Sequence, residues 1–314
     1  MPSSCSSICC GPISTRPRWP PRLPNIRVGR GGLAEDDTMV VDNAVTDAEQ
    51  HEPPPHLATR VISALVLIPV ALAAVWLGGI WFAGLLGIGG FLMALEWAAL
   101  IGLAGKRLFA FAIVSLLIAT GFVASAGAAP DPRWTIAVLA LGAVTAIAGF
   151  ALHRSRTGWI GLGIVYCWTP VYALAWLRAS EHGLWWVAWV LLVVWGTDIG
   201  AYFVGRAVGG AKLVPHISPN KTWSGLVGGM VLAAVAAAIA ARWFAMESIL
   251  ALAIAAAGLA VVAQAGDIVE SAIKRHFGKK DSGWVIPGHG GILDRVDGLV
   301  FVTPLVALVV AIWG

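Results

Sequence analysis

The fold is decided by residues 249–313, where two apolar segments enclose a short polar one. The first apolar segment, 249–270, reads ILALAIAAAGLAVVAQAGDIVE, and the second, 298–313, reads GLVFVTPLVALVVAIW. Between them, residues 271–297 read SAIKRHFGKKDSGWVIPGHGGILDRVD. An apolar helix of about 20 residues is long enough to cross a bilayer, so the pattern predicts two membrane helices joined by a charged connection. Cations grouped with carboxylates beside a bilayer indicate metal-assisted chemistry on a phosphate.

The composition of the whole chain is that of a membrane protein. Of the 314 residues, 58% are hydrophobic and 12% are charged, whereas a soluble domain carries about 25% charged residues. The chain also has 16 Trp, a residue that concentrates at membrane–water interfaces. The basic residues form no continuous basic face, which argues against nucleic-acid binding. We therefore expect an all-α polytopic integral membrane protein with no nucleic-acid partner.

Nine apolar segments approach membrane length, and they give the predicted domain organisation. Residues 1–56 are rich in Pro, Ser, Arg and acids, contain no apolar run, and are predicted to be a disordered tail. Met39 is an alternative start of translation within that tail. Residues 57–314 are predicted to form one transmembrane domain. Its predicted spans are residues 61–79, 80–104, 108–128, 134–152, 159–178, 184–205, 224–243, 249–270 and 298–313.

The Lys and Arg residues predict which way the spans face. Of the 16 beyond the tail, 13 fall in alternate connections on one side, and three, Arg133, Arg178 and Arg242, fall on the other. Lys and Arg are enriched in cytoplasmic connections. We therefore expect a cytoplasmic N-terminus, a periplasmic C-terminus, and cytoplasmic positions for the two long polar connections, 198–225 and 271–297.

Two acidic residues close to the ends of apolar segments mark the predicted site. Asp198 lies near the end of the sixth span, and Asp267 near the end of the eighth. An acid at the mouth of a membrane helix is costly and usually faces a polar cavity and a partner. We expect both to converge with the acids of 271–297 on Mg²⁺, which binds carboxylates, water and substrate phosphates. The alternative is that these acids only neutralise nearby Lys and Arg.

The connection before the seventh span has features of a phosphate site. Ser218 followed by Pro219 is typical of a helix N-cap with Pro at the first helical position. Lys221 and Thr222 would then stand in the first turn, with Lys212 close upstream. The free amides of a helix N-terminus favour an anion. An ordinary capped helix with cytoplasmic basic residues explains the same pattern.

Two further residues each allow two interpretations. His289 lies in the glycine turn PGHGG, residues 287–291. There it would contact substrate or transfer a proton, or else hydrogen-bond the backbone. Glu96 lies within the second apolar span, where it has a functional role or pairs with a neighbouring helix.

The polar residues of the C-terminal part resemble the signature of the bacterial phosphatidate cytidylyltransferases, also called CDP-diacylglycerol synthases. The main pattern is Ser271-x2-Lys274-Arg275-x4-Lys280-Asp281-x-Gly283-x3-Pro287-x-His289-Gly290-Gly291-x2-Asp294-Arg295-x-Asp297. Two earlier runs are similar to an upstream motif of the family, namely Asp198-x-Gly200-Ala201-Tyr202 and Ser218-Pro219-Asn220-Lys221-Thr222-Trp223-x-Gly225. Ser224 departs from that motif, since many relatives carry Glu there. The resemblance covers the last third of the chain, and the first five spans match only in being hydrophobic.

The resemblance implies a membrane enzyme that converts phosphatidic acid and CTP to CDP-diacylglycerol and pyrophosphate. It would work with Mg²⁺, or with two metal ions, on the cytoplasmic face of the bacterial inner membrane. Residues 57–314 would be its cytidylyltransferase domain, and the protein would form a homodimer. Asp267 and Asp294 would bind the metal. The predicted catalytic residues are Asp267, Asp294, Lys274, Asp297 and Asp281, and the predicted phosphate-binding residues are Ser218, Asn220, Lys221, Thr222, Lys212, Arg275, Lys280, His289, Arg295 and Asp198.

Three other functions share parts of the pattern. A CTP-dependent polyprenol or phytol kinase would use the same nucleotide in a membrane fold, but would transfer its γ-phosphate to an alcohol. A secondary transporter would bury acids near the midplane and show inverted repeats, and no repeat is evident in this sequence. A purely structural membrane protein would not need residues 271–297 to be charged.

Overall fold

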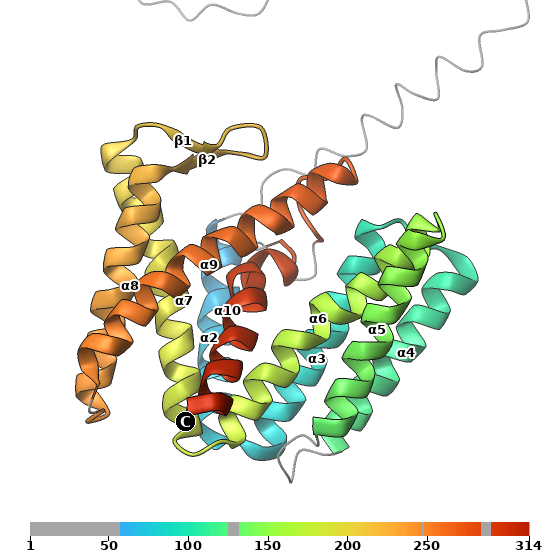
Figure 1. Ribbon diagram of the computed structural model, residues 1–314, viewed down its shortest axis with the longest axis horizontal. Helices are drawn as coiled ribbons and strands as arrows, with labels where there is room; N and C mark the ends of the chain where they lie inside the picture. The colour runs from blue at the N-terminus through green and yellow to red at the C-terminus, as the bar shows by residue number, and fades with distance from the viewer. Residues whose placement is uncertain (1–56, 125–131, 247, 284–289, 314) are drawn as a thin grey trace, which may run out of the picture. The chain divides into compact units, whose positions relative to one another are not determined.

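The computed structural model describes residues 57–124, 132–246, 248–283 and 290–313. These residues form nine α-helices and one two-stranded sheet (Figure 1). The predicted disordered tail, 1–56, lies outside them. The elements are α2 Leu57–Leu77, α3 Gly79–Leu100, α4 Gly105–Ala124, α5 Pro132–Ala151, α6 Ser155–Ala179, α7 Gly183–Val208, β1 Lys212–Val214, β2 Ser218–Thr222, α8 Trp223–Trp243, α9 Ile249–His276 and α10 Leu293–Trp313.

Seven of these helices are long and apolar enough to cross a membrane, which confirms a polytopic helical membrane protein. They are α3, α4, α6, α7, α8, α9 and α10. Helices α2 and α5 contribute shorter apolar stretches, Leu65–Leu77 and Ile136–Ala151. Each predicted span coincides with one helix, but the count of nine spans stays a prediction because of these two.

The helix boundaries differ most from the prediction on both sides of the charged connection. The predicted eighth span stops at residue 270, but α9 continues to His276. The predicted last span begins at residue 298, but α10 begins at Leu293. Ala, Lys and Arg follow the apolar run and are good helix formers, so the chain remains helical beyond it. Residues 271–297 therefore include the end of α9, up to His276, and the start of α10, from Leu293.

A β-hairpin between α7 and α8 is the element that the sequence did not predict (Figure 1). β1 pairs with β2 in antiparallel register, with Lys212 opposite Thr222. Ser218, predicted as a helix N-cap, instead begins β2. The N-cap of α8 is Thr222, whose hydroxyl accepts a hydrogen bond from Gly225 N at 3.1 Å. The prediction that Ser218 is the N-cap was therefore wrong. It failed because the φ angle that Pro219 imposes suits an extended strand as well as the start of a helix.

The buried side chains form two clusters that share α10. The first lies mainly between α7, α8, α9 and α10, and the second mainly between α3, α4, α6 and α10. Glycine permits close approach of neighbouring helices. A Cβ atom on Gly200 of α7, for example, would lie 2.4 Å from the carbonyl oxygen of Gly228 on α8. Small residues at interfaces allow membrane helices to pack in this way. Helix α10 contacts α3 and α6 as well as α7 and α9, which places its first turns next to polar groups from both clusters.

Candidate active site

A cavity of about 530 Å³ lies where the polar ends of several helices meet. Residues of α7, β2, α8, α9 and α10 form its walls. Asp198 and Asp267, which were predicted to converge, both line it. The hydrogen-bonding and charged residues of its lining are Asp198, Tyr202, Asn220, Lys221, Thr222, Gln264, Asp267, Asp294, Arg295 and Asp297.

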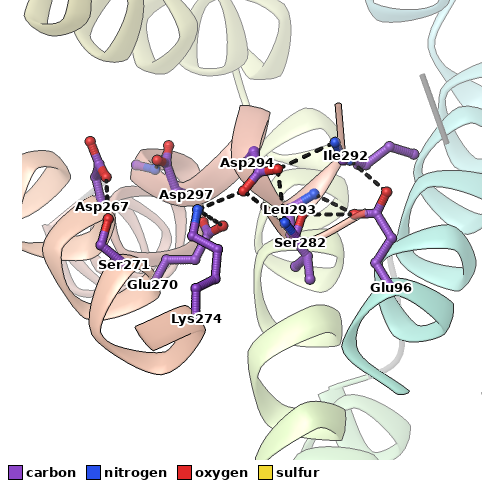
Figure 2. A network of polar contacts seen from close by, with 12 residues as sticks. Glu96, Asp267, Glu270, Ser271, Lys274, Ser282, Ile292, Leu293, Asp294 and Asp297 are labelled. Atoms are coloured by element: carbon purple, nitrogen blue, oxygen red, sulfur yellow. Dashed lines mark hydrogen bonds and ion pairs between the residues drawn. The ribbon is translucent and has the colours of Figure 1, made fainter. Parts of the chain in front are cut away.

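Lys221 and Asp267 form an ion pair in this cavity. Lys221 Nζ lies 2.5 Å from Asp267 Oδ2, and the two side chains are 15% and 31% exposed. The other carboxylate oxygen, Oδ1, accepts a hydrogen bond from Ser271 Oγ at 3.4 Å, one turn along α9 (Figure 2). Lys221 also donates to the backbone oxygen of Gln264 at 3.4 Å. Strand β2 thus brings a cation to an acid of α9, in a partly buried place where salt screens the pair weakly.

Asp297 places a second carboxylate near Asp267. Helices α9 and α10 approach closely at Gly266, where a Cβ atom would lie 2.8 Å from the backbone oxygen of Asp297. Asp267 and Asp198 are near enough for their negative charges to act on the Asp297 carboxylate. Asp297 Oδ1 accepts a hydrogen bond from Gly298 N at 2.7 Å. Because grouped carboxylates repel one another, this part of the cavity favours a cation.

Asp294 belongs to a neighbouring network centred on Lys274 (Figure 2). Lys274 Nζ lies 2.6 Å from Asp294 Oδ1 and 3.1 Å from Glu270 Oε1. Asp294 also accepts hydrogen bonds from Ser282 N at 3.1 Å and from Gly291 N at 3.3 Å. Protein donors therefore engage both oxygens of Asp294.

The acids of the cavity differ in their suitability for a metal ion. Within the described ranges, no group of three or more His, Cys, Asp or Glu side chains is arranged to hold a metal. Mg²⁺ commonly binds one or two carboxylates and completes its shell with water and substrate phosphates, so a pair is sufficient. Asp267 and Asp297 lie near each other in the cavity. Asp267 pairs with Lys221 and Asp294 with Lys274, but Lys221 lines the cavity, where a phosphate can reach it, whereas Lys274 does not. The donors present therefore fit a hard cation at Asp267 and Asp297.

Glu96, in the apolar helix α3, reaches the start of α10. The residue is 3% exposed. Its Oε1 accepts a hydrogen bond from Ile292 N and its Oε2 one from Leu293 N, both at 2.9 Å (Figure 2). Ser282 Oγ donates to Oε2 at 3.4 Å. The sequence left open whether Glu96 has a functional role or pairs with a neighbouring helix. The structure shows that it contacts the start of α10 by accepting hydrogen bonds from backbone amides.

Some residues predicted to act in the site do not line this cavity. They are Ser218, Lys212, Lys274, Arg275, Lys280 and Asp281. All except Ser218 and Lys274 are exposed. Exposed cations near a site still attract an anionic substrate through their field. His289 lies outside the described residues, so its predicted role stays a prediction.

Two acidic residues of this region were absent from the predicted site. Glu270 is 2% exposed and pairs with Lys274 one turn later on α9, and that i,i+4 spacing was a usable signal. Glu96 contacts Ile292 across 196 residues of sequence. Its acidic side chain in an apolar span was the only local sign of importance.

Comparison with known proteins identifies the family of this chain. A model of the cytidylyltransferase family matches residues 58–313. The phosphatidate cytidylyltransferase of Brucella suis is 40% identical over 265 residues, which is 82% of this chain and 95% of that protein. The protein of that name from Brucella abortus has the same identity and coverage. The one from Bacillus subtilis is 40% identical over 184 residues, 57% of this chain and 67% of its own length. Because the family model spans the helical domain, this chain belongs to the cytidylyltransferase family.

Proposed function

We propose that this protein transfers the cytidylyl group of CTP to phosphatidic acid, giving CDP-diacylglycerol and pyrophosphate. Relatives named for that activity are 40% identical across 82% of the chain. The observation that carries the proposal is the cavity in which Lys221, Asp267 and Asp297 meet at the ends of membrane-length helices. A nucleotide would bind in this polar cavity while the acyl chains of the lipid remain in the bilayer.

The reaction joins two anionic substrates, so its main demand is electrostatic. The phosphate monoester of phosphatidic acid is largely an oxyanion near neutral pH and needs no strong general base. One of its oxygens forms a bond to the α-phosphorus of CTP. The bond from that phosphorus to the bridging oxygen breaks, and pyrophosphate leaves with the electron pair. The tasks of the protein are to align the two phosphates and to stabilise the charge that develops between them.

The cationic and amide side chains of the cavity suit this task. Lys221 and Arg295 would neutralise phosphate oxygens, and the amide of Asn220 would orient them. Lys221 already pairs with Asp267, so a bound phosphate provides it with a second anionic partner. Lys274, which the sequence predicts as a catalytic residue, is 12% exposed within its acidic network and does not line the cavity. We therefore propose that it holds the acids in place without contacting substrate.

Asp267 and Asp297 would hold Mg²⁺, with water and phosphate oxygens as the other ligands. Bound there, the ion would neutralise triphosphate charge and stabilise the leaving pyrophosphate. We propose Asp297 in the place that the sequence-based prediction gave to Asp294, because Asp294 is engaged by Lys274, which lies outside the cavity lining, and by the amides of Ser282 and Gly291. The partner of Asp267, Lys221, lines the cavity and can instead turn to a bound phosphate.

The distribution of positive charge supports a cytoplasmic site in the bacterial inner membrane. Of the 16 Lys and Arg residues beyond residue 56, 13 fall in the connections that the predicted topology places on the same side as 198–225 and 271–297, and such residues are enriched on the cytoplasmic side. The proposed topology has nine spans, with α2 and α5 added to the seven long helices, a cytoplasmic N-terminus and a periplasmic C-terminus. We also propose the homodimer that the family resemblance implies, which sizing of the detergent-solubilised protein would test.

The activity is tested with purified protein, phosphatidic acid, Mg²⁺ and CTP labelled at the α-phosphorus. The proposal predicts label in a lipid that comigrates with CDP-diacylglycerol, and none when phosphatidic acid is omitted. CTP labelled at the γ-phosphorus is the matched control and should yield label only in pyrophosphate. Label from the γ position in a lipid would identify a CTP-dependent lipid kinase and would refute the proposal.

A further inference from the structure

No capping side chain comes from the described residues directly before helix α10. The residues before it, Gly290, Gly291 and Ile292, carry no side-chain oxygen, whereas N-caps are usually Ser, Thr, Asp or Asn. The first amides of a helix have no partner within the helix and need one elsewhere. Glu96 of α3 supplies it, because its two oxygens accept hydrogen bonds from Ile292 N and Leu293 N at 2.9 Å each.

The packing around Glu96 is built for this contact. A Cβ atom on Gly283 would lie 2.9 Å from Glu96 Cγ, and one on Gly291 would lie 2.9 Å from Glu96 Oε2. Glycine at both positions lets the backbone approach the carboxylate. Ser282 Oγ adds a third hydrogen bond at 3.4 Å. The chain therefore passes Glu96 twice, once after α9 and once at the start of α10.

A second contact joins α3 to the same connection. Lys279 Nζ donates to Ala99 O at 2.5 Å. Ala99 lies in the last turn of α3, where a cation is favourable, and its carbonyl oxygen also accepts a hydrogen bond from Gly102 N at 3.2 Å. Helix α3 thus contacts the connection between α9 and α10 at two points. The carboxylate of Glu96 binds the amides at the start of α10, and the carbonyl oxygen of Ala99 binds Lys279.

We propose that Glu96 is a positioning residue that fixes the first turns of α10 and thereby sets the affinity of the site for Mg²⁺. Asp294 and Asp297 lie in those turns. Asp297 follows Ile292 by five residues, which is about 7.5 Å along a helix. A shift of the capped end therefore moves the carboxylate that lies near Asp267. The inference rests on the proposed function, since it takes Asp267 and Asp297 as the metal ligands.

Stability alone does not separate this role from that of a structural cap. The loss of hydrogen bonds to a buried carboxylate destabilises the protein in either case. The distinguishing quantity is Mg²⁺ affinity, because groups that orient metal ligands change it about 10- to 100-fold.

The test compares Glu96→Gln with the wild-type protein in detergent, by hydrogen–deuterium exchange and by titration of thermal stability with Mg²⁺. Gln keeps the shape of the side chain but has one acceptor oxygen, so one of the two amides loses its partner. We expect faster exchange in residues 291–297. We also expect the Mg²⁺ concentration for half-maximal stabilisation to rise about tenfold or more. Glu96→Asp keeps the charge on a shorter side chain. Its exchange rate in residues 291–297 and its Mg²⁺ concentration for half-maximal stabilisation should both lie between those of the wild type and of Glu96→Gln.

Thr303→Val is the matched control. Thr303 is fully buried in the same helix, and its hydroxyl donates to Leu299 O at 2.8 Å, within that helix. It should change neither the exchange at residues 291–297 nor the Mg²⁺ requirement. Two results would overturn the inference. Faster exchange in Glu96→Gln with an unchanged Mg²⁺ requirement would show that Glu96 is only a structural cap. Unchanged exchange in Glu96→Gln would show that Glu96 does not fix the start of α10. The readouts need no turnover, so a wild-type protein that binds Mg²⁺ but forms no CDP-lipid would refute the proposed function alone.

Discussion

Lys274→Met is the substitution whose cost the structure defines best. Lys274 Nζ lies 3.1 Å from Glu270 and 2.6 Å from Asp294, and the three side chains are 12%, 3% and 15% exposed. Met fills a similar volume without a charge, so two largely buried carboxylates lose their cation. Removal of one partner from a buried ion pair costs about 3–5 kcal/mol, mainly because the remaining charge is left uncompensated.

This loss of stability predicts a measurable fall in the melting temperature. For a domain of this size, 1 kcal/mol corresponds to about 2–4 °C in melting temperature, so Lys274→Met should melt roughly 6–20 °C below the wild-type protein. Lys280→Met is the control, because Lys280 is exposed on the same connection, and exposed substitutions change stability by about 0.5 kcal/mol or less. Thermal unfolding in detergent, followed by the fluorescence of the 16 Trp, measures both.

A second background isolates the interaction. In Glu270→Gln one of the two acids is already neutral, so the further change Lys274→Met should cost less than it does in the wild-type protein. The difference between the two costs is the coupling energy of the pair. An unchanged melting temperature in Lys274→Met, or equal losses in both backgrounds, would refute the claim that Lys274 compensates buried acids.

Other substitutions separate the site from its scaffold. Asp297→Asn should remove the stabilisation by Mg²⁺ in a thermal titration, and a wild-type response would count against the metal assignment. Gly161→Val should lower the melting temperature, because a Cβ atom there would lie 2.3 Å from Ala146 N on α5; a variant as stable as the wild type would contradict the packing of α5 on α6. Arg178→Met should lower the melting temperature but not the turnover of folded protein, because Arg178 donates to carbonyl oxygens at the end of α2, away from the cavity. Loss of turnover at an unchanged melting temperature would argue against that scaffold role.

Hydropathy locates the helices of this protein well, because a membrane helix satisfies its backbone hydrogen bonds within one segment. Each predicted span coincides with one helix. The sequence also identifies four acids that line the cavity, Asp198, Asp267, Asp294 and Asp297. Acids are rare in membrane segments, so these residues stand out against the apolar background.

The features that the sequence does not reveal depend on partners elsewhere in the chain. Ser218 and Pro219 satisfy a strand as well as a helix start, and only pairing with β1 decides between them. Glu96 accepts a hydrogen bond from Leu293 N, 197 residues away in the sequence. Capping patterns are recognised from residues next to a helix end, so they cannot reveal a capping residue that comes from another helix. The resemblance assigns the metal to Asp294 and not to Asp297, and only the folded chain shows that Lys274 forms an ion pair with Asp294.

The most direct test of the central claim is cytidylyl transfer by Asp267→Asn, measured with α-labelled CTP, phosphatidic acid and Mg²⁺. Asn keeps the shape of the side chain and an oxygen that can accept from Lys221, so the protein should remain folded. Loss of one of two carboxylates that hold the metal should lower turnover by about 100-fold or more. Turnover close to the wild-type rate in a folded Asp267→Asn protein would contradict the claim that this cavity is the active site.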